Sequence, residues 1–215
     1  SLSVNEALEK QLEKGPAVLC GSAGMGKTTA LLHSLISKSR SYSPLQVATI
    51  YVSLFDYNGS GENFIKNRIL EDLKFDKSIQ YMEDARNSLI KIFNETVKTE
   101  RSEKVRFLLL IDGLNEAGGD TQPLIKEILS LSEMKGVCVI ITSRNRPEKL
   151  PFDFLEIVPL DEKDIRSILS SNSLIYPESP EMQEILRTPL LLSAFCKAAT
   201  SKEKQLQCST AGELL

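Results

Sequence analysis

The feature that most constrains this chain is an octapeptide with the sequence GSAGMGKT, which occupies residues 21–28. It matches the pattern GxxxxGK[ST] at every position, and it stands between a short apolar run and a segment with helical spacing. In such loops the glycines let backbone N–H groups point inward at a phosphate, and the following helix contributes the positive end of its dipole. The motif predicts a phosphate-binding loop made of Gly21, Ser22, Ala23, Gly24, Met25, Gly26, Lys27, Thr28 and Thr29.

Two side chains at the end of this loop have expected chemical roles. The Lys27 ammonium is expected to reach the β- and γ-phosphates, and the Thr28 hydroxyl is expected to bind Mg²⁺. The alternative interpretation is an ordinary glycine-rich turn.

Short β-rich runs alternate with longer helical segments up to residue 158. This alternation is typical of an α/β fold with a mainly parallel sheet covered by helices. Strands are predicted at residues 17–20, 47–54, 107–112, 137–142 and 154–158. The runs at 107–111 and 137–141 are wholly apolar, as expected of strands that are buried on both faces.

Helices are predicted between these strands from apolar residues spaced three and four apart. A short helix is predicted at residues 4–12, a second follows the phosphate-binding loop, and a further one opens at Thr121. Two more are indicated by Phe64, Ile65, Ile69, Leu70 and Leu73, and by Met82, Ala85, Leu89, Ile92, Phe93 and Thr96.

From Pro159 onward the pattern is helical only. Helices are predicted at 162–170, from Pro180, and from Pro189 to about residue 199. We therefore expect a nucleotide-binding domain at 1–158 and a small all-α domain at 159–215. Because residues 211–215 resemble the opening of another helix, we expect the chain to be a piece of a longer protein.

Composition and charge exclude several classes of function. The chain has 26 Lys and Arg against 29 Asp and Glu, which leaves no basic excess for nucleic acid or an anionic membrane. No apolar run approaches the ~18 residues of a membrane span, and the start of the chain does not resemble a signal peptide. Its four cysteines fit no metal-binding spacing, and the single histidine, His33, excludes a multi-histidine metal site. We expect a cytoplasmic protein with reduced, buried thiols at Cys20 and Cys138.

A carboxylate ends the predicted strand at 107–112. Asp112 is expected to hold Mg²⁺ directly or through water, because it stands at the carboxyl end of a buried strand. Asn115 and Glu116 follow within one turn. Glu116 can accept a proton from the water that attacks the γ-phosphate, although this pair could also be a plain polar loop.

Two further segments contain candidate residues. Arg144 follows the predicted strand at 137–142, where its guanidinium could sense the γ-phosphate through charge-assisted hydrogen bonds. A surface arginine after a strand is the alternative. Thr188 and Pro189 could contact the nucleotide, but the start of a helix also explains them.

Taken in order, five segments of the chain resemble the NACHT group of STAND signal-transduction NTPases. They are residues 21–28, LLLIDGLNE at 108–116, ITSR at 141–144, LDEKD at 160–164 and TPLLL at 188–192. The resemblance implies a P-loop NTPase fold with three αβα layers and a parallel sheet of order 5-1-4-3-2, followed by the small all-α domain.

The resemblance also implies roles for individual residues. Lys27 and Thr28 would bind phosphate and Mg²⁺, and Asp112 would be the magnesium aspartate. Glu116 matches the catalytic acid position and Arg144 the sensor arginine, while Pro189 matches the proline that packs near the nucleotide base. One departure is Asn115, where the family usually has Asp, and this argues against fast hydrolysis.

The function that the resemblance implies is an ATP- and ADP-dependent switch with Mg²⁺ as cofactor and slow ATPase activity. Members of this group resemble defence receptors, and self-association is expected of the full-length protein. A nucleotide-binding scaffold without turnover is one alternative. An AAA+-like motor is another alternative. Such a motor requires a second sensor arginine in the helical domain, where Arg166 and Arg187 are available. Adenine is favoured over guanine because no NKxD string is present.

Overall fold

A sheet of five parallel strands forms the centre of the computed structural model, which describes residues 4–40, 47–59, 61–75, 79–98 and 103–200. The strands are arranged in the order β2 (Ala48–Ser53), β5 (Phe107–Asp112), β6 (Val137–Ser143), β1 (Ala17–Cys20) and β7 (Asp153–Glu156). All four neighbouring pairs run parallel. Counted along the chain, the predicted strands lie in the order 2-3-4-1-5, which is the predicted order 5-1-4-3-2 viewed from the other edge.

The strand composition explains which strands lie in the middle of the sheet. Every residue of β6 and β1 is buried, and so are five of the six residues of β5. The edge strand β7 is mostly exposed, and β2 is buried only at Val52. Wholly apolar strands are stable only where helices cover both faces, so the prediction of strands buried on both faces is confirmed.

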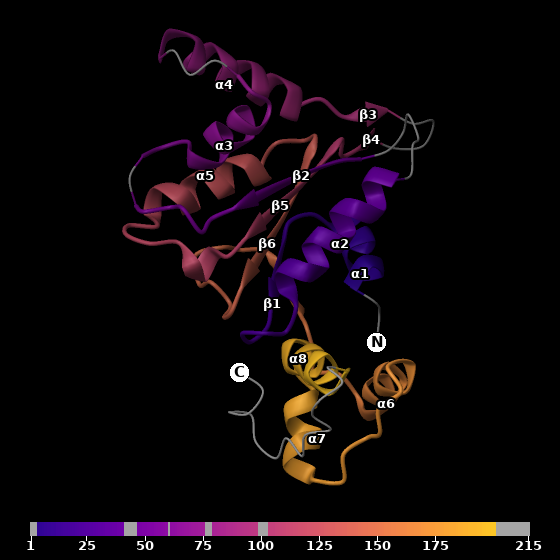
Figure 1. Ribbon diagram of the computed structural model, residues 1–215. Coiled ribbons are helices and arrows are strands. Elements are labelled where there is room, and N and C mark those ends of the chain that lie inside the picture. The colour runs from indigo at the N-terminus through magenta and orange to yellow at the C-terminus, as the bar shows by residue number, and fades with distance from the viewer. Residues whose placement is uncertain (1–3, 41–46, 60, 76–78, 99–102, 201–215) are drawn as a thin grey trace. The chain divides into compact units, whose positions relative to one another are not determined.

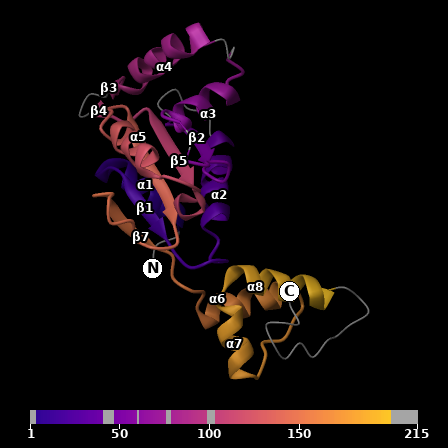
Figure 2. The ribbon, with the colours of Figure 1, turned by 90° about the vertical axis from the view of Figure 1, so that its left-hand side faces the viewer.

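Helices cover both faces of this sheet (Figure 1). On one face lie α1 (Val4–Lys14) and α2 (Lys27–Arg40), and on the other lie α3 (Phe64–Asp72), α4 (Ile79–Phe93) and α5 (Gln122–Ser132). The 90° view separates α2 from α4 and α5 in the same way (Figure 2). The chain thus has the three-layer αβα architecture that the sequence predicts.

The helix predicted to continue through Thr96 ends earlier, at Phe93. Gly136 donates its N–H to the Phe93 carbonyl, and a Cβ at position 136 would overlap the Glu95 carbonyl oxygen. The chain then forms a two-stranded antiparallel ribbon, β3 (Val97–Lys98) and β4 (Glu103–Lys104), which the sequence did not predict. A contact between distant segments therefore sets the end of α4.

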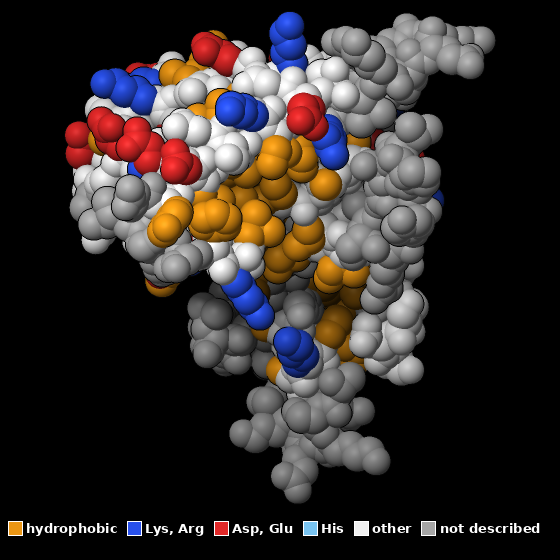
Figure 3. Space-filling model, turned by 90° about the horizontal axis from the view of Figure 1, so that it is seen from above, with side chains coloured by type: hydrophobic (Ala, Val, Ile, Leu, Met, Phe, Trp, Pro, Cys, Tyr) orange, Lys and Arg blue, Asp and Glu red, His pale blue; other side chains and the backbone are white. Residues whose placement is uncertain are grey.

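Two residues of the apolar stripes predicted at 64–73 and 82–96 are exposed rather than buried. Leu73 follows the last residue of α3 and is 67% exposed, and Ile92 in the last turn of α4 is 42% exposed. A view from above shows hydrophobic side chains grouped among charged ones on the molecular surface (Figure 3). Helical spacing alone does not distinguish an apolar side chain at a helix end from one in the core.

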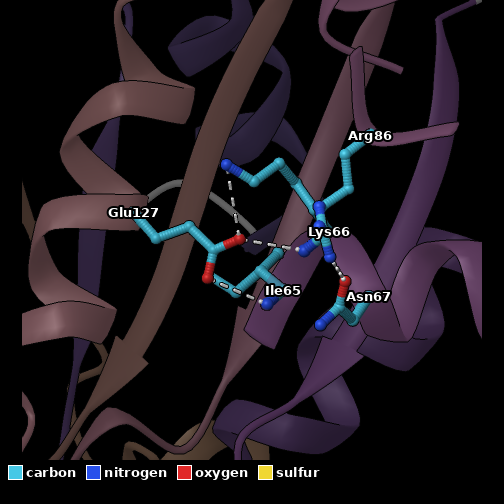
Figure 4. A network of polar contacts seen from close by, with 5 residues as sticks. All are labelled: Ile65, Lys66, Asn67, Arg86 and Glu127. Atoms are coloured by element: carbon cyan, nitrogen blue, oxygen red, sulfur yellow. Dashed lines mark hydrogen bonds and ion pairs between the residues drawn. The ribbon is translucent and has the colours of Figure 1, made fainter. Parts of the chain in front are cut away.

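The N-terminus of α3 is held by a side chain of α5 (Figure 4). Asn63 precedes α3 in a left-handed conformation and makes no side-chain cap. Glu127 caps the helix instead, because its two carboxylate oxygens accept the N–H groups of Ile65 and Lys66, each at 3.0 Å. The Lys66 ammonium lies 3.9 Å from the same carboxylate, and Glu127 and Lys66 are only 6% and 7% exposed.

Burial raises the pKa of the Glu127 carboxyl, while the N–H donors and the nearby cations oppose this rise. A carboxylate removed from water needs such donors to remain stable in the charged form. This buried network fixes α3 against α5 on one face of the sheet.

By its contacts the chain divides into two compact units. The first contains the chain up to Cys20 together with Lys27–Glu156, and the second contains the loop Gly21–Gly26 together with the described chain from Ile157 onward. The second unit holds α6 (Glu162–Ser171), α7 (Pro180–Leu186) and α8 (Pro189–Thr200). The predicted division at residue 158 into two domains remains a prediction.

Local capping explains where α6 and α7 start. The Asp161 carboxylate accepts the N–H of Asp164, and the Ser179 hydroxyl accepts the N–H of Met182. A small apolar core joins the three helices through Ile165, Leu169, Leu186, Leu192 and Cys196. Cys208 and the helix opening predicted at 211–215 lie outside the described residues.

Two of the remaining sequence expectations concern burial and membrane spans. Cys20 and Cys138 are buried, at 3% and 1% exposure, as predicted for small hydrophobic residues. Among the helices that the structure describes, none has both the length and the apolar content needed to cross a membrane.

Candidate functional site

Four of the predicted site residues come together at the carboxyl edge of the sheet. Lys27 is the first residue of α2, Asp112 is the last of β5, and Arg144 follows β6 directly. Glu116 ends the short 3₁₀ turn Leu114–Glu116 (η1) after β5. Because the strands run parallel, the segments that follow them emerge at the same edge, where ligands bind in folds of this kind.

The electrostatics of Lys27 reflect this grouping. Burial and the nearby Arg144 guanidinium lower the pKa of the Lys27 ammonium, while the Asp112 and Glu116 carboxylates act in the opposite direction. Two cations and two carboxylates therefore lie close enough to influence one another. A phosphate group placed near both cations would be bound more strongly than by either one alone.

Asp112 is held at both oxygens of its carboxylate. The Thr142 hydroxyl donates to Oδ1 at 2.5 Å, and the Tyr51 hydroxyl donates to Oδ2 at 3.0 Å. The Thr142 hydroxyl in turn accepts the N–H of Gly113 at 2.7 Å. The Asp112 side chain, from a residue only 8% exposed, is thus fixed in direction by β2, β6 and its own turn.

The turn after Asp112 requires a small residue. Gly113 has φ 86°, a left-handed conformation that favours glycine. A Cβ at this position would also lie 3.2 Å from a carboxylate oxygen of Glu116. Gly113 therefore lets Glu116 approach the end of β5.

Glu116 and Arg144 form an ion pair at the surface. The Arg144 Nη2 atom lies 3.9 Å from the Glu116 Oε1 atom, and the two side chains are 55% and 48% exposed. Asn115 links the same two segments, because its Oδ1 atom accepts the Arg144 N–H at 2.9 Å. An exposed pair of this kind is weak, so both charged ends can be redirected toward a ligand.

The loop Gly21–Gly26 has the backbone that its glycines predict. Gly24 and Gly26 have φ values of 78° and 83°, which other residues rarely adopt. A Cβ at Gly24 would lie 3.1 Å from the Thr188 methyl group and 3.2 Å from the Leu190 Cβ, so close packing also requires glycine there. The Gly24 carbonyl accepts the Leu190 N–H at 3.1 Å, which joins this loop to the first turn of α8.

The remaining predicted residues flank this loop. Thr28 and Thr29 are exposed in the first turn of α2, and Pro189 is the first residue of α8. The donor set fits a magnesium ion, because Thr28 and Asp112 offer a hydroxyl and a carboxylate, the hard oxygen ligands that Mg²⁺ prefers. The loop fits a phosphate because the left-handed conformations of Gly24 and Gly26 are of the kind that lets backbone N–H groups face an anion.

Sequence reasoning missed Tyr51, and it gave no role to the Thr142 hydroxyl or the Asn115 amide. Tyr51 pairs with Leu110 in the β2–β5 register, and Leu110 lies on the same strand face as Asp112. The tyrosine ring therefore extends along that face to the aspartate. Burial and the charge of Asp112 raise the pKa of Tyr51 to about 12. The predicted strand order places β2 beside β5, but this contact also depends on the register that sets Tyr51 opposite Leu110, which neither strand shows in its own sequence.

Several solved structures share the fold. A signal transduction ATPase with numerous domains (STAND) from Pyrococcus horikoshii, which has a tetratricopeptide repeat sensor, matches 96% of this chain with TM-score 0.55 and 16% identity. The Aeropyrum pernix ORC1 protein in complex with DNA matches 94% with TM-score 0.56 and 16% identity. AMPPCP-bound DnaA from Aquifex aeolicus matches 92% with TM-score 0.50 and 20% identity.

At these identities the likeness concerns the fold. The chain spans 31%, 60% and 61% of the lengths of these three proteins, so each is considerably longer than the matched region. No curated protein sequence matches the chain.

A family model provides the sequence-level match. The model of the NACHT domain matches residues 16–172, which is more than half of the chain and includes the glycine-rich loop, β5 with its acidic turn, and β6 with Arg144. The strand order and the STAND neighbour agree with this match. The chain therefore belongs to the NACHT family of P-loop NTPases.

Proposed function

We propose that this chain is the nucleotide-binding core of a signalling switch that binds ATP and ADP with Mg²⁺ and hydrolyses ATP slowly. The observation that carries the proposal is the gathering of Lys27, Asp112, Glu116 and Arg144 at the carboxyl edge of the sheet. Lys27 also follows the glycine-rich loop directly in the chain. Membership of the NACHT family supports nucleotide binding in general, and the steps below follow from the residues of this chain.

Phosphate binding is assigned to the loop and to two cations. The loop N–H groups and the start of α2 favour a negative ligand. Burial and repulsion from the nearby Arg144 guanidinium lower the pKa of the Lys27 ammonium. A polyphosphate relieves this repulsion, so its binding is favoured at this edge. Arg144 is the group proposed to contact the γ-phosphate.

The metal site is assigned to Thr28 and Asp112. When bound, Mg²⁺ neutralises charge on the phosphate oxygens. The chain's own contribution is to hold the Asp112 carboxylate in one orientation, which the hydroxyl groups of Tyr51 and Thr142 do by donating to its two oxygens.

Hydrolysis is assigned to Glu116. Its carboxylate is half exposed, so it can accept a proton from a water molecule that attacks the γ-phosphate. Asp112 is buried and accepts a hydrogen bond at each of its oxygens, so it is less accessible to an attacking water than Glu116 is. Slow turnover is proposed because an amide, Asn115, stands where the family usually has a second acid.

Coupling to conformation is assigned to the contact between the loop and α8. The Leu190 N–H donates to the Gly24 carbonyl, so a change of loop conformation on phosphate binding would shift the first turn of α8. Pro189 stands in the same turn and is proposed to pack near the base. The predicted domains at 1–158 and 159–215 would then report the nucleotide state. They are proposed to belong to a cytoplasmic protein that self-associates at full length and acts in defence signalling.

One alternative function is supported by a specific observation. In a scaffold that binds nucleotide without turnover, the pairing of Glu116 with Arg144 would hold the Glu116 carboxylate away from a catalytic role. An AAA+-like motor is less well supported. Arg166 bonds Glu162 and lies over the Tyr176 ring, and Arg187 bonds Glu184 and the Leu160 carbonyl, so both candidate sensors are used within their own helical unit.

Two measurements test the proposal. Acid extraction of the purified protein followed by chromatography should identify ADP, whereas GDP or GTP would contradict the adenine assignment. Lys27→Ala should abolish ATP binding. Since ligand at a hundredfold excess over its Kd stabilises a fold by about 2.7 kcal/mol, Mg-ATP should raise the Tm of the wild type and leave this variant unchanged. An equal rise in both proteins would remove Lys27 from the site.

A further inference from the structure

We propose that Tyr51 is a positioning residue for magnesium: its hydroxyl orients the Asp112 carboxylate so that the metal is held with the nucleotide. The inference deepens the proposed function and rests on it. It concerns a residue on β2, the strand at the edge of the sheet, which none of the sequence motifs contains.

The geometry separates the two oxygens of Asp112 by their partners. The donor to Oδ1 comes from Thr142 on β6, and the donor to Oδ2 comes from Tyr51 on β2. These strands flank β5 on its two sides. A carboxylate restrained from both sides cannot rotate about its Cβ–Cγ bond without breaking one of the two hydrogen bonds.

This arrangement matters for a metal ligand more than for the fold. A carboxylate oxygen has two lone pairs, so each oxygen of Asp112 can accept a hydrogen bond and still face a cation or a metal-bound water. Groups that orient a ligating carboxylate contribute to metal affinity, and their loss typically costs ten- to a hundredfold. Without Tyr51 the carboxylate would be restrained only by the hydrogen bond from Thr142 to Oδ1, and Mg²⁺ affinity should fall.

The chain offers a matched control in Tyr57. This tyrosine lies in the loop after β2, is 2% exposed, and donates its hydroxyl to the Asp120 carbonyl at 2.8 Å. Tyr57→Phe therefore removes a buried phenol hydrogen bond of similar length that does not involve Asp112. Any general cost of losing a tyrosine hydroxyl appears in this variant too.

The test is the affinity for ATP of the whole chain, measured by titration calorimetry in excess MgCl₂ and again in excess EDTA. Tyr51→Phe should weaken ATP binding about tenfold in MgCl₂ and by less than about twofold in EDTA. Tyr57→Phe should change neither. Equal losses in both solutions, or no loss in either, would overturn the positioning role.

A double-mutant cycle distinguishes a role that acts through the Asp112 carboxylate from a general structural role of Tyr51. In an Asp112→Asn background, Tyr51→Phe should cause no further loss in MgCl₂, because its effect passes through the carboxylate. An undiminished loss in that background would overturn the inference. Should Tyr51→Phe not fold, Thr142→Val removes the donor to Oδ1 instead and should give the same metal-specific loss, whose absence would overturn the proposal. If the wild type itself bound no ATP, the proposed function would fail first.

Discussion

Arg144→Ala tests whether a guanidinium at the end of β6 distinguishes ATP from ADP. In the structure the Arg144 side chain pairs with Glu116 at 3.9 Å, and both side chains are about half exposed. Such a pair is worth about 0–1 kcal/mol, so little is lost when the guanidinium turns to a ligand. A hydrogen bond to a charged group contributes about 1.5–3 kcal/mol. The difference, about 0.5–3 kcal/mol, corresponds to a loss of roughly 2- to 150-fold in ATP affinity.

ADP lacks the γ-phosphate, so its affinity should change by less than about twofold. The backbone N–H of residue 144 still donates to Asn115 in the alanine variant, which keeps the turn after β5 in place. Titration calorimetry with ATP and with ADP, both with Mg²⁺, measures the two affinities. Arg146→Ala is the matched control, because its guanidinium lies over the Phe154 ring at 5.6 Å and should affect neither nucleotide. Equal losses for ATP and ADP in Arg144→Ala would refute the reasoning and leave the arginine a structural role.

Three further predictions concern catalysis, stability and pH. Glu116→Gln should keep ATP binding while single-turnover hydrolysis falls by about 10²–10⁴-fold, because the proton acceptor is lost; a wild-type rate would favour the scaffold. Glu127→Met should lower the free energy of unfolding by about 2–6 kcal/mol in urea titrations at neutral pH, since two buried N–H groups lose their acceptor, whereas exposed Glu133→Met should cost under about 0.5 kcal/mol. The pKa of Tyr51 is raised to about 12, so its protonated form is favoured in the fold and its contribution to stability is complete below pH ~10 and lost as pH rises toward 12. Alkaline absorbance titration should accordingly lose one late-titrating phenol in Tyr51→Phe, and a variant that loses an early one instead would contradict the assignment.

The sequence by itself determined the class of this protein and much of its sheet. The loop at residues 21–28 has a spacing that few other structures require, and the wholly apolar runs at 107–111 and 137–141 indicated strands covered on both faces. Strand β5 was predicted with the bounds Phe107–Asp112 that the structure has, since a change from apolar residues to an acid marks its end. These signals are local, so they can be read along the chain.

Contacts between distant segments were decided by the tertiary structure. The end of α4 at Phe93 depends on Gly136, and the cap of α3 is supplied by Glu127 from α5, about sixty residues later in the chain. Neither partner is adjacent in sequence, so neither helix boundary could be derived from the residues beside it. Leu73 was likewise predicted to lie in the apolar stripe of its helix, but it follows the last residue of α3 and is exposed.

The candidate site divides in the same way. Its charged residues were predicted from local patterns: Lys27 from the glycine-rich loop, and Asp112, Glu116 and Arg144 from the strand ends that they occupy or follow. The groups that hold them were not found: Tyr51 reaches Asp112 only because β2 pairs with β5 in a register that sets Tyr51 opposite Leu110. Local patterns suffice to nominate the candidate residues, whereas the orientation of their side chains depends on the register in which neighbouring strands pair when the chain folds.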